Sequence, residues 1–195
     1  MNVILKNGDQ ISLEENSTAY AAALAISEGL ARNAVCAKVN GELVDLSHAL
    51  KDGDTLEIVT LKDKEGLGVY RHTCAHVLAQ ALKTVYPTCK LSIGPVIENG
   101  FYYDVDFVTP ISASDLEKIE VEMKKIIKEG LVLEQFEMDA DEAIRMMEEK
   151  GEIYKVELIK EHADKGENIS FFKQAEFDEL CAGPHIPDTS RVKAF

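Results

Sequence analysis

The sequence lacks an apolar run long enough to cross a membrane, and its first residues lack the form of a signal peptide. It also lacks a Cys-x-x-Cys pair, internal repeats and low-complexity segments. Without evidence of secretion, the cysteines are best interpreted as reduced thiols. They are Cys36, Cys74, Cys89 and Cys181. These absences predict a cytoplasmic protein with no membrane contact.

Positive charge is also scarce. The 195 residues contain 21 Lys and Arg against 35 Asp and Glu, which gives a formal net charge of −14 at pH 7. This balance excludes a protein that coats nucleic acid by charge alone, although a local basic path on an acidic body remains compatible with it. We therefore expect any RNA contact made by this chain alone to be weak.

The pattern of turns and periodic segments predicts an α+β protein with two units. Residues 1–61 show a hairpin, a helix and further strands, which is the order of a small β-grasp, ubiquitin-like domain. Residues 62–68 are charged, contain two glycines and are interpreted as a linker. Residues 69–195 alternate amphipathic helices with strands, and predict a mixed domain whose sheet is partly covered by helices.

The elements expected in the first unit surround Asn7-Gly8, a strong hairpin signal. They are strands at 3–5, 10–13, 35–39, 43–44 and 55–59, a helix at 18–25 and a helical turn at 46–50. The second unit is expected to contain helices at 71–86, 114–130, 139–150 and 154–162. Its expected strands are 91–97, 101–107, 131–138, 169–172 and 176–180.

The first candidate site lies on the helix that opens the second unit. His72 and His76 are four residues apart, so they lie one turn apart on one side of that helix, away from its apolar stripe. The pair therefore faces either solvent or a cleft. A lone His-x-x-x-His on a helix is more often an exposed pair than a site.

A second pair, Cys181 and His185, has the same spacing, but Gly183-Pro184 excludes a regular helix between its members. Three imidazoles and a thiol can bind zinc, because Cys and His are its preferred ligands. They can equally position a water molecule or hydrogen-bond a substrate. Spacing alone leaves metal site, hydrolytic site and coincidence open.

Three motifs together resemble the N-terminal half of bacterial threonyl-tRNA synthetases. They are Arg-His-Thr-Cys-Ala-His at 71–76, Ile-Gly-Pro-Val-Ile-Glu-Asn-Gly-Phe-Tyr-Tyr-Asp at 93–104 and Leu-Cys-Ala-Gly-Pro-His-Ile-Pro at 180–187. The resemblance covers essentially the whole chain. The first unit is similar to that family's TGS domain, and the second to its editing domain, which also occurs in alanyl-tRNA synthetases and free-standing alanyl deacylases.

The resemblance implies a proofreading function, the hydrolysis of the ester in mischarged seryl-tRNA(Thr). It implies that the aminoacylation core, with its ATP, magnesium and zinc sites, is absent from this chain. The expected partner is the acceptor end of tRNA(Thr) carrying serine. The whole enzyme is expected to be a homodimer, with dimer contacts mainly in the core, and this chain a monomer.

By matched position, the resemblance implies that one pocket holds the terminal adenosine and the seryl group. The implied catalytic residues are His72, His76, Lys155, Glu179, Cys181 and His185, and the implied substrate-binding residues are Gly94, Pro95, Tyr103 and Asp104. Without the resemblance, Lys155 reads as a solvated helix lysine, and Tyr103 as packing on a sheet face. We interpret His48 and His162 as surface histidines, and Cys36 and Cys89 as packing residues.

Two positions depart from the family pattern. Glu179 stands where the family usually has aspartate, so the carboxylate is one methylene longer, and Asp178 takes that role instead if the strand bulges. Ala182 stands where the family often has arginine, which removes a potential contact to RNA phosphate.

Zinc divides the possible mechanisms. In the alanyl branch the His-x-x-x-His and Cys-x-x-x-His residues hold zinc, whereas the threonyl branch uses them for water and substrate, so no metal or other cofactor is expected for editing. The first alternative is a zinc-dependent deacylase of the alanyl type that uses His72, His76, Cys181 and His185 as ligands. The second is a non-catalytic RNA-binding or partner-binding module.

Overall fold

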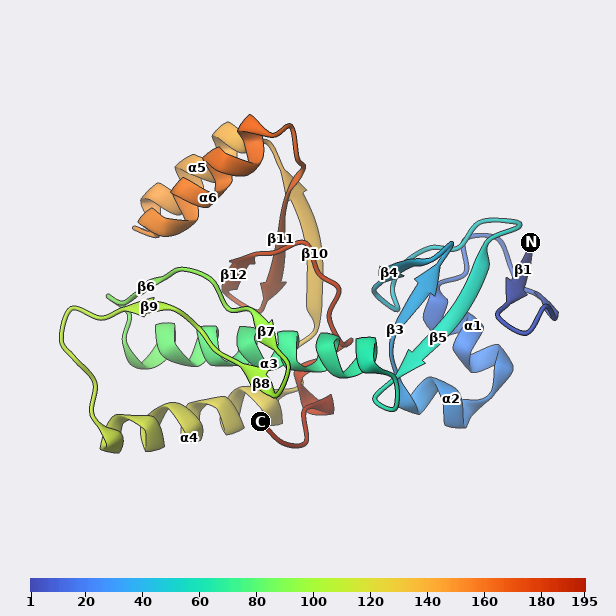
Figure 1. Ribbon diagram of the computed structural model, residues 1–195, viewed down its shortest axis with the longest axis horizontal. Helices are drawn as coiled ribbons and strands as arrows, with labels where there is room; N and C mark the ends of the chain where they lie inside the picture. The colour runs from blue at the N-terminus through green and yellow to red at the C-terminus, as the bar shows by residue number, and fades with distance from the viewer. The chain divides into compact units, whose positions relative to one another are not determined.

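The structure is a computed structural model that describes residues 1–195, and the chain divides into two compact units (Figure 1). The first unit contains residues 1–70 together with 183–187. The second contains residues 71–182 together with 188–195. The short segment 183–187 thus groups with the first unit, although its neighbours in the sequence belong to the second. Each unit is described by itself.

The first unit is a five-stranded sheet with two short helices. Its strand order is β2-β1-β5-β3-β4; β1 and β5 are parallel, and the other neighbouring strands are antiparallel. This is the expected β-grasp arrangement. The elements are β1 (Asn2–Leu5), β2 (Gln10–Ser12), α1 (Ala19–Ile26), α2 (Glu28–Asn33), β3 (Ala34–Val39), β4 (Glu42–Val44) and β5 (Thr55–Thr60).

Local sequence explains the boundaries of these elements. Gly8 turns the β1–β2 hairpin with φ of +89°, a conformation that glycine adopts without steric cost. The Thr18 hydroxyl caps α1 by accepting a hydrogen bond from the Ala21 N–H at 3.2 Å. The alanines of α1 allow the helix to pack closely against Val3 and Leu56 of the sheet. The helical turn expected at 46–50 is instead a non-helical turn, because the backbone there pairs with residues 17–20.

The second unit contains four helices, a three-stranded sheet and two short strand pairs. The sheet has the order β10-β11-β12 and is antiparallel throughout. Its helices are α3 (Lys64–Val85, which begins in the first unit), α4 (Ala113–Glu129), α5 (Ala140–Glu149) and α6 (Ile153–Asp164), followed by a 3₁₀ turn, η1 (Thr189–Arg191). Its strands are β6 (Lys90–Leu91), β7 (Val96–Ile97), β8 (Gly100–Phe101), β9 (Val105–Asp106), β10 (Leu133–Met138), β11 (Ile169–Gln174) and β12 (Phe177–Leu180).

Two expectations about this region were wrong. Most of the segment expected as a linker, residues 62–68, is helical, because α3 begins at Lys64. Gly66 fits there because it approaches the Thr60 carbonyl so closely that a Cβ would lie 2.0 Å from the oxygen. The long strands expected at 91–97 and 101–107 are two separate short pairings, β6 with β9 and β7 with β8.

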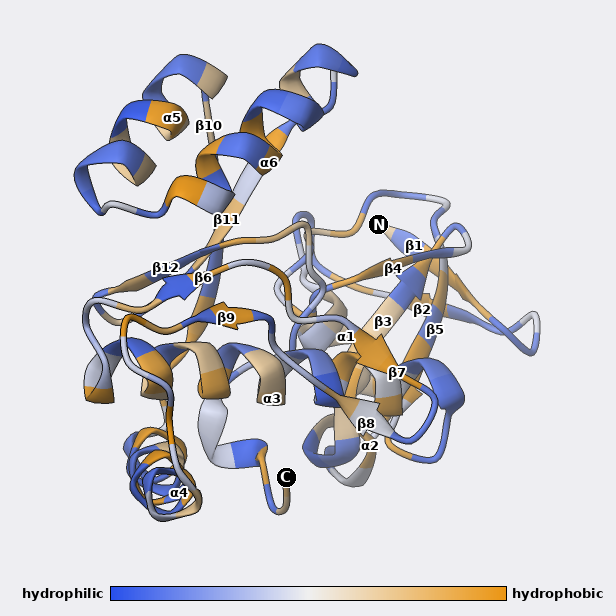
Figure 2. Cartoon of the chain, turned by 60° about the vertical axis from the view of Figure 1, so that its left-hand side comes forward, coloured by the Kyte–Doolittle hydropathy of each residue, from blue (hydrophilic) through white to orange (hydrophobic).

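The helices of the second unit bury apolar faces in two clusters. One cluster joins α3 and α4 through residues such as Leu82 and Met123, and the other joins α5, α6 and β11 through Met147, Ile159 and Phe171. Hydrophobic and hydrophilic residues alternate along α4, α5 and α6, as Figure 2 shows. Gly130 ends α4 in the left-handed conformation, as its position predicts.

None of the helices is both long enough and apolar enough to span a membrane. None of the four cysteines forms a disulfide, and Cys36 and Cys89 are buried packing residues, as expected. Burial raises the pKa of the Cys36 thiol to about 12, so this cysteine stays a neutral thiol.

Candidate active site in the second unit

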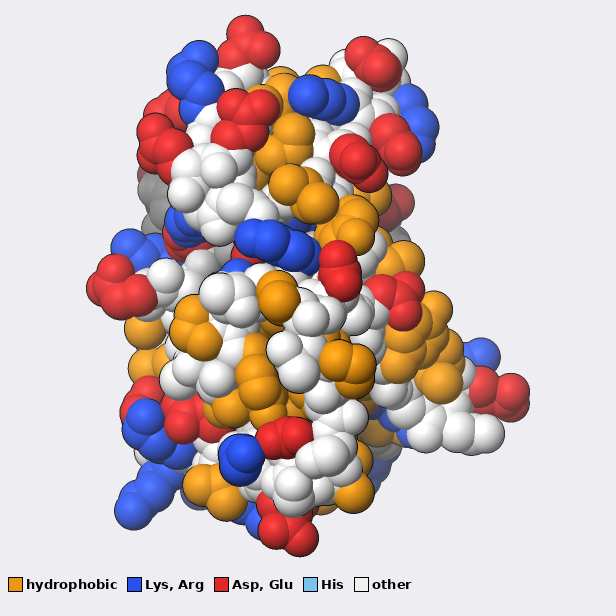
Figure 3. Space-filling model, turned by 90° about the vertical axis from the view of Figure 1, so that its left-hand side faces the viewer, with side chains coloured by type: hydrophobic (Ala, Val, Ile, Leu, Met, Phe, Trp, Pro, Cys, Tyr) orange, Lys and Arg blue, Asp and Glu red, His pale blue; other side chains and the backbone are white.

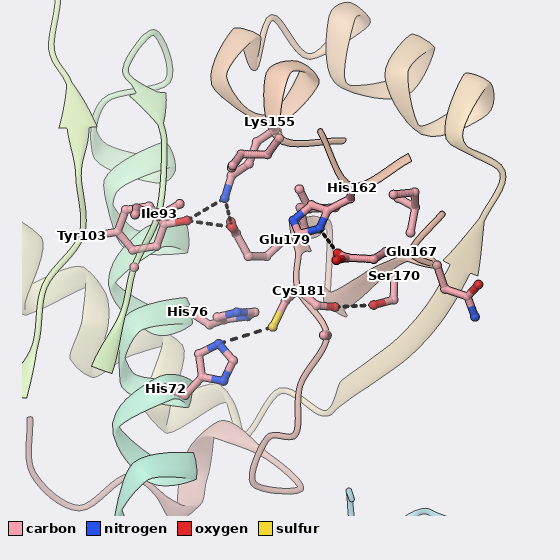
Figure 4. A pocket seen from close by; sticks show the side chains of 16 residues that line it. His72, His76, Ile93, Tyr103, Lys155, His162, Glu167, Ser170, Glu179 and Cys181 are labelled. Atoms are coloured by element: carbon pink, nitrogen blue, oxygen red, sulfur yellow. Dashed lines mark hydrogen bonds and ion pairs between the residues drawn. The ribbon is translucent and has the colours of Figure 1, made fainter. Parts of the chain in front are cut away.

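A cavity of about 250 Å³ brings together most of the expected site residues. Its wall is built from α3, the segment before β7, α6, β11 and the end of β12 (Figure 4). Of the expected residues in this unit, the cavity wall includes His72, His76, Gly94, Tyr103, Lys155, Glu179 and Cys181. Segments more than 100 residues apart in the sequence therefore meet at one place.

The histidine pair faces this cavity and not open solvent. His76 is only 3% exposed, and the rings of His72 and His76 lie edge to face with centroids 5.1 Å apart. The His72 Nε2 atom lies 3.3 Å from the Cys181 Sγ atom, across from α3 (Figure 4). The alternative of a pair exposed to solvent is therefore contradicted by the burial of His76.

Cys181 is held in place through its backbone. Its N–H donates to the Ser170 carbonyl at 3.0 Å, and the Ser170 hydroxyl donates to the Cys181 carbonyl at 2.8 Å. These two bonds extend the pairing of β11 with β12 by one residue. The thiol consequently leaves the strand end at a fixed position beside His72.

A second polar group in the cavity consists of Lys155, Glu179 and Tyr103 (Figure 4). Lys155 and Glu179 form an ion pair, and their residues are only 4% and 3% exposed. The Tyr103 hydroxyl donates to Glu179 Oε1 at 2.7 Å, and the Lys155 ammonium donates to the Tyr103 oxygen at 3.0 Å. Lys155 is therefore not the solvated helix lysine that its surroundings in the sequence suggest.

The electrostatics of this group keep Tyr103 protonated. Burial, together with the negative charge of Glu179, raises the pKa of Tyr103 well above its ordinary value. A neutral phenol donates its proton to the carboxylate and can accept from the ammonium at the same time. Since an ammonium has three N–H donors and two are directed at Glu179 and Tyr103, one remains for a water or a ligand in the cavity.

Gly94 is required by the position of Tyr103. A Cβ at residue 94 would lie 2.4 and 2.5 Å from the Cδ2 and Cε2 atoms of the Tyr103 ring, distances that real structures essentially never show. The glycine thus allows the ring to lie against the backbone. This close approach to Tyr103 is the reason that Gly94 lies at the cavity.

The exchange Gly94→Ala should displace the Tyr103 ring and weaken its hydrogen bond to Glu179. The rate of any reaction catalysed in this cavity should fall by about 10-fold to 10²-fold, because small misplacements of catalytic groups have effects of that size. The exchange Gly100→Ala is a matched control, since a Cβ there meets nothing within 4 Å. A Gly94→Ala protein with an unchanged rate would show that Tyr103 is not needed where the structure places it.

Other expected residues do not line this cavity. Asp104 is exposed, its backbone pairs with Ser92 and Ile93, and Pro95 lies outside the wall. Asp178 forms an ion pair with Lys150 instead of joining Lys155, so Glu179 is the carboxylate at the site and no bulge is needed.

His185 belongs to the first unit, where its backbone N–H donates to Asp45 Oδ1 at 2.7 Å. Burial raises the pKa of Asp45, and this hydrogen bond opposes the rise.

Several lining residues were not expected. His162, interpreted as a surface histidine, lines the cavity and pairs with Glu167, which lies at the end of the loop before β11. Asn168 and Ser170 follow in the same segment. No sequence signal marked them, because their positions depend on how the loop between α6 and β11 returns to the sheet.

The donor set at the cavity fits a zinc ion in type and spacing. His72, His76 and Cys181 each offer one ligand atom, and these atoms lie within 4.8 Å of one another. In a tetrahedral zinc site, metal–ligand bonds of 2.0 to 2.3 Å separate neighbouring ligand atoms by about 3.5 Å, which matches the separation of His72 Nε2 and Cys181 Sγ. His185, four residues after Cys181 in the sequence, is the fourth donor by residue type. The cluster could therefore bind a metal.

Comparison with known proteins supplies the family. A family model described as "TGS domain" matches residues 1–60. The chain is 53% identical over 195 residues to the threonine–tRNA ligase of Acetivibrio thermocellus. The aligned region covers all of this chain and 31% of that protein. The corresponding ligase of Clostridioides difficile is 52% identical over 194 residues, covering 100% of the chain and 30% of the relative. That of Carboxydothermus hydrogenoformans is 49% identical over 189 residues, with 97% and 30% covered.

The chain is homologous to the N-terminal region of threonine–tRNA ligases. It spans about a third of the length of the curated relatives that it matches. The TGS domain coincides with the β-grasp sheet of the first unit, since the match ends at the last residue of β5. The cavity described above lies in the second unit of this threonine–tRNA ligase homologue, outside the TGS match.

Proposed function

We propose that this chain is the proofreading part of a threonine–tRNA ligase, and that it hydrolyses the ester bond of tRNA(Thr) mischarged with serine. The proposal is carried by one observation. A buried lysine–glutamate–tyrosine group and the imidazoles of His72 and His76 line the same cavity, in a chain homologous to threonine–tRNA ligases. A buried charge that is paired and also faces a cavity is more typical of a binding or catalytic site than of a stabilising contact.

The chemistry of the two amino acids gives a reason for such an activity. Serine and threonine differ by one methyl group, and a synthetic site gains only about 1–3 kcal/mol of discrimination from a methyl or methylene group. A second site that admits serine and has no room for the methyl group of threonine corrects the remaining errors. A cavity of about 250 Å³ with several polar side chains in its wall is suited to a small polar aminoacyl group.

The side chains divide the work of ester hydrolysis between them. A water molecule adds to the carbonyl carbon of the seryl ester, and an imidazole, which we assign to His72, takes its proton. The Lys155 ammonium directs its remaining N–H at the oxygen that becomes negatively charged. When the carbon–oxygen bond to the ribose breaks, the departing oxygen takes up a proton, and serine and tRNA with a free hydroxyl are released.

Glu179 and Tyr103 hold the lysine for this role. The ion pair with Glu179 holds the Lys155 side chain, and the Tyr103 hydroxyl contacts its Nζ atom from a second direction. His76 and Cys181 are assigned to binding the terminal adenosine and the seryl group. Glu179 carries out the function of the shorter aspartate of the family.

The charge of the chain bears on its partner. On the face shown in Figure 3, basic and acidic side chains are interspersed and form no single basic patch. The absence of a basic patch on this face and the net charge of −14 predict that the chain alone binds tRNA(Thr) weakly. Hydrolysis is therefore best measured with the protein in large excess over the tRNA.

The experiment that tests the proposal is single-turnover deacylation of seryl-tRNA(Thr) by the 195-residue chain. Release of serine well above the spontaneous rate, increasing with protein concentration until it saturates, is the expected result. Binding of the tRNA without release of serine would contradict the proposal and favour a non-catalytic RNA-binding module.

A zinc-dependent hydrolase is the second candidate, and the spacing of the donor atoms at His72, His76 and Cys181 favours it. Bound zinc would polarise a water molecule or the ester carbonyl. We instead expect treatment with a chelator, followed by removal of the complex, to leave the single-turnover rate constant within about two-fold, because Lys155 and His72 supply the needed groups. Loss of activity on chelation and its return with zinc alone would establish the metal mechanism.

A further inference from the structure

A second cavity lies on the other side of Lys155. It has a volume of about 410 Å³ and shares two wall residues, Lys155 and Glu179, with the first cavity. Lys155 lies in the wall that the two cavities share, although it is only 4% exposed. Polar contacts hold its ammonium, and the first turn of α6 holds the base of its side chain.

One face of α3 lies along both cavities. His72, His76, Gln80 and Lys83 follow at intervals of four, four and three residues, which places them on one side of the helix. His72 and His76 line the first cavity, and Gln80 and Lys83 line the second. The same helix thus carries an imidazole pair on one side of Lys155 and a cation on the other.

Lys83, which is partly exposed, forms an ion pair with the buried Glu152. Its Nζ atom lies 2.5 Å from Glu152 Oε1, and Glu152 is only 6% exposed. The other carboxylate oxygen accepts a hydrogen bond from the Leu91 N–H at 3.1 Å. The lysine is held in turn by the carbonyls of Pro87 and Cys89, at 3.0 and 2.9 Å. All of these groups are therefore tied into one polar network that joins α3, β6 and residue 152.

The position of Glu152 links this network to the site. It is the residue immediately before α6, and Lys155 is the third residue of that helix. The Glu152 carboxylate therefore fixes the first turn of α6 against α3. The Lys155 side chain extends from this first turn of α6 to Glu179 and Tyr103.

We propose that Lys83 and Glu152 are positioning residues that set the place of the Lys155 ammonium relative to the histidines of α3. Neither side chain touches the substrate or the reacting atoms. This inference rests on the proposed function where it is tested by the rate of deacylation. Its second readout, the chemical reactivity of Lys155, is independent of any activity.

The test compares variants of the full 195-residue chain. Lys83→Met removes the cation and strands the Glu152 carboxylate, Lys83→Arg restores a cation, and the double exchange Lys83→Met with Glu152→Gln removes both charges without stranding either. Lys150→Met is the matched control: it breaks the Lys150–Asp178 ion pair at the wall of the same cavity, but Lys150 is 40% exposed.

The activity readout is single-turnover deacylation of seryl-tRNA(Thr), with the rate constant at saturating protein separated from the protein concentration that gives half the maximal rate. We expect Lys83→Met and the double variant to lower the rate constant by about 10-fold or more, with half-saturation unchanged. Lys83→Arg should recover most of the loss, and Lys150→Met should leave the rate constant unchanged. If these variants lose only part of the active protein and keep the rate constant of the unmodified chain, Lys83 and Glu152 have only a structural role, and the inference is overturned.

The second readout is modification of lysine amines by an acylating reagent, with each lysine followed by mass spectrometry. The buried, paired Lys155 should react slowly in the unmodified chain, several-fold faster in Lys83→Met and slowly again in Lys83→Arg. Unchanged reactivity of Lys155 in both Lys83→Met and the double variant would overturn the inference. If the unmodified chain does not deacylate seryl-tRNA, the proposed function fails, and the reactivity of Lys155 still decides this inference.

Discussion

Replacing Lys155 with methionine should slow the hydrolysis of seryl-tRNA(Thr) by about 10²-fold or more, because removal of one preorganised charge at a developing oxyanion typically has an effect of that size. Methionine keeps most of the length of the side chain and removes only the charged donor. The measurement is the single-turnover rate constant at saturating protein. Lys160→Met is a matched control, since Lys160 lies on the same helix and is exposed.

Stability has to be separated from catalysis in this experiment. Removing Lys155 leaves Glu179 buried without its cation, which destabilises a protein by about 3–5 kcal/mol when a buried ion pair is broken on one side. The double exchange Lys155→Met with Glu179→Gln removes both charges and should recover most of this stability in urea unfolding. Its rate should remain as low as that of the single variant. A double variant that recovers stability and wild-type activity together would show that Lys155 has no catalytic role.

Replacing His72 with alanine should also slow deacylation by about 10²-fold, the usual contribution of a general base. The exchange removes the imidazole that lies beside Cys181 and leaves the buried His76 and the Lys155 group in place. Because His72 is only partly buried, the folded fraction should stay close to that of the unmodified chain. His48→Ala is the control, since His48 is an exposed histidine of the TGS domain.

A normal rate in His72→Ala would remove His72 from the mechanism and leave Lys155 as the group that orders the attacking water. Normal rates in both His72→Ala and Lys155→Met would contradict the assignment of the site altogether. The zinc-dependent alternative gives a further distinction, because His72→Ala would then also lower the zinc content of the protein.

Much of the fold follows from local signals in the sequence. Asn7-Gly8 specifies a hairpin, Thr18 begins α1 and Gly130 ends α4. The spacing of apolar residues marks the long helices of the second unit. These features depend on neighbouring residues only. The continuous helix from Lys64 was missed, because two glycines and several charges resemble a linker, and because the close approach of Gly66 to Thr60 is a tertiary contact.

The site was predictable to different degrees. Four-residue spacing alone placed His72 and His76 on one side of a helix, and suggested Cys181 as a companion. The role of Lys155 came only from resemblance to a family, because a lysine at the start of a charged helix is normally exposed. Its burial results from Tyr103 and Glu179, which lie 52 and 24 residues away in the sequence.

The groups behind the site gave no signal at all. Glu152 and Lys83 look like ordinary charged residues of helix ends, and only the fold brings the partly exposed Lys83 within 2.5 Å of the buried Glu152. His162 was interpreted as a surface residue, and its side chain is 42% exposed, but the sequence did not show that it also lines the cavity beside Glu167. Ion pairs between distant elements have no local pattern in the sequence from which they could be recognised.

The most direct test of the central claim is the ratio of deacylation rate constants for seryl-tRNA(Thr) and threonyl-tRNA(Thr), measured in single turnover with the same saturating protein sample. The account predicts fast release of serine and a threonyl rate close to the spontaneous one, because the proposed second site discriminates against the additional methyl group. Equal acceleration of both esters would contradict the account, since the site would then destroy the correct product along with the error.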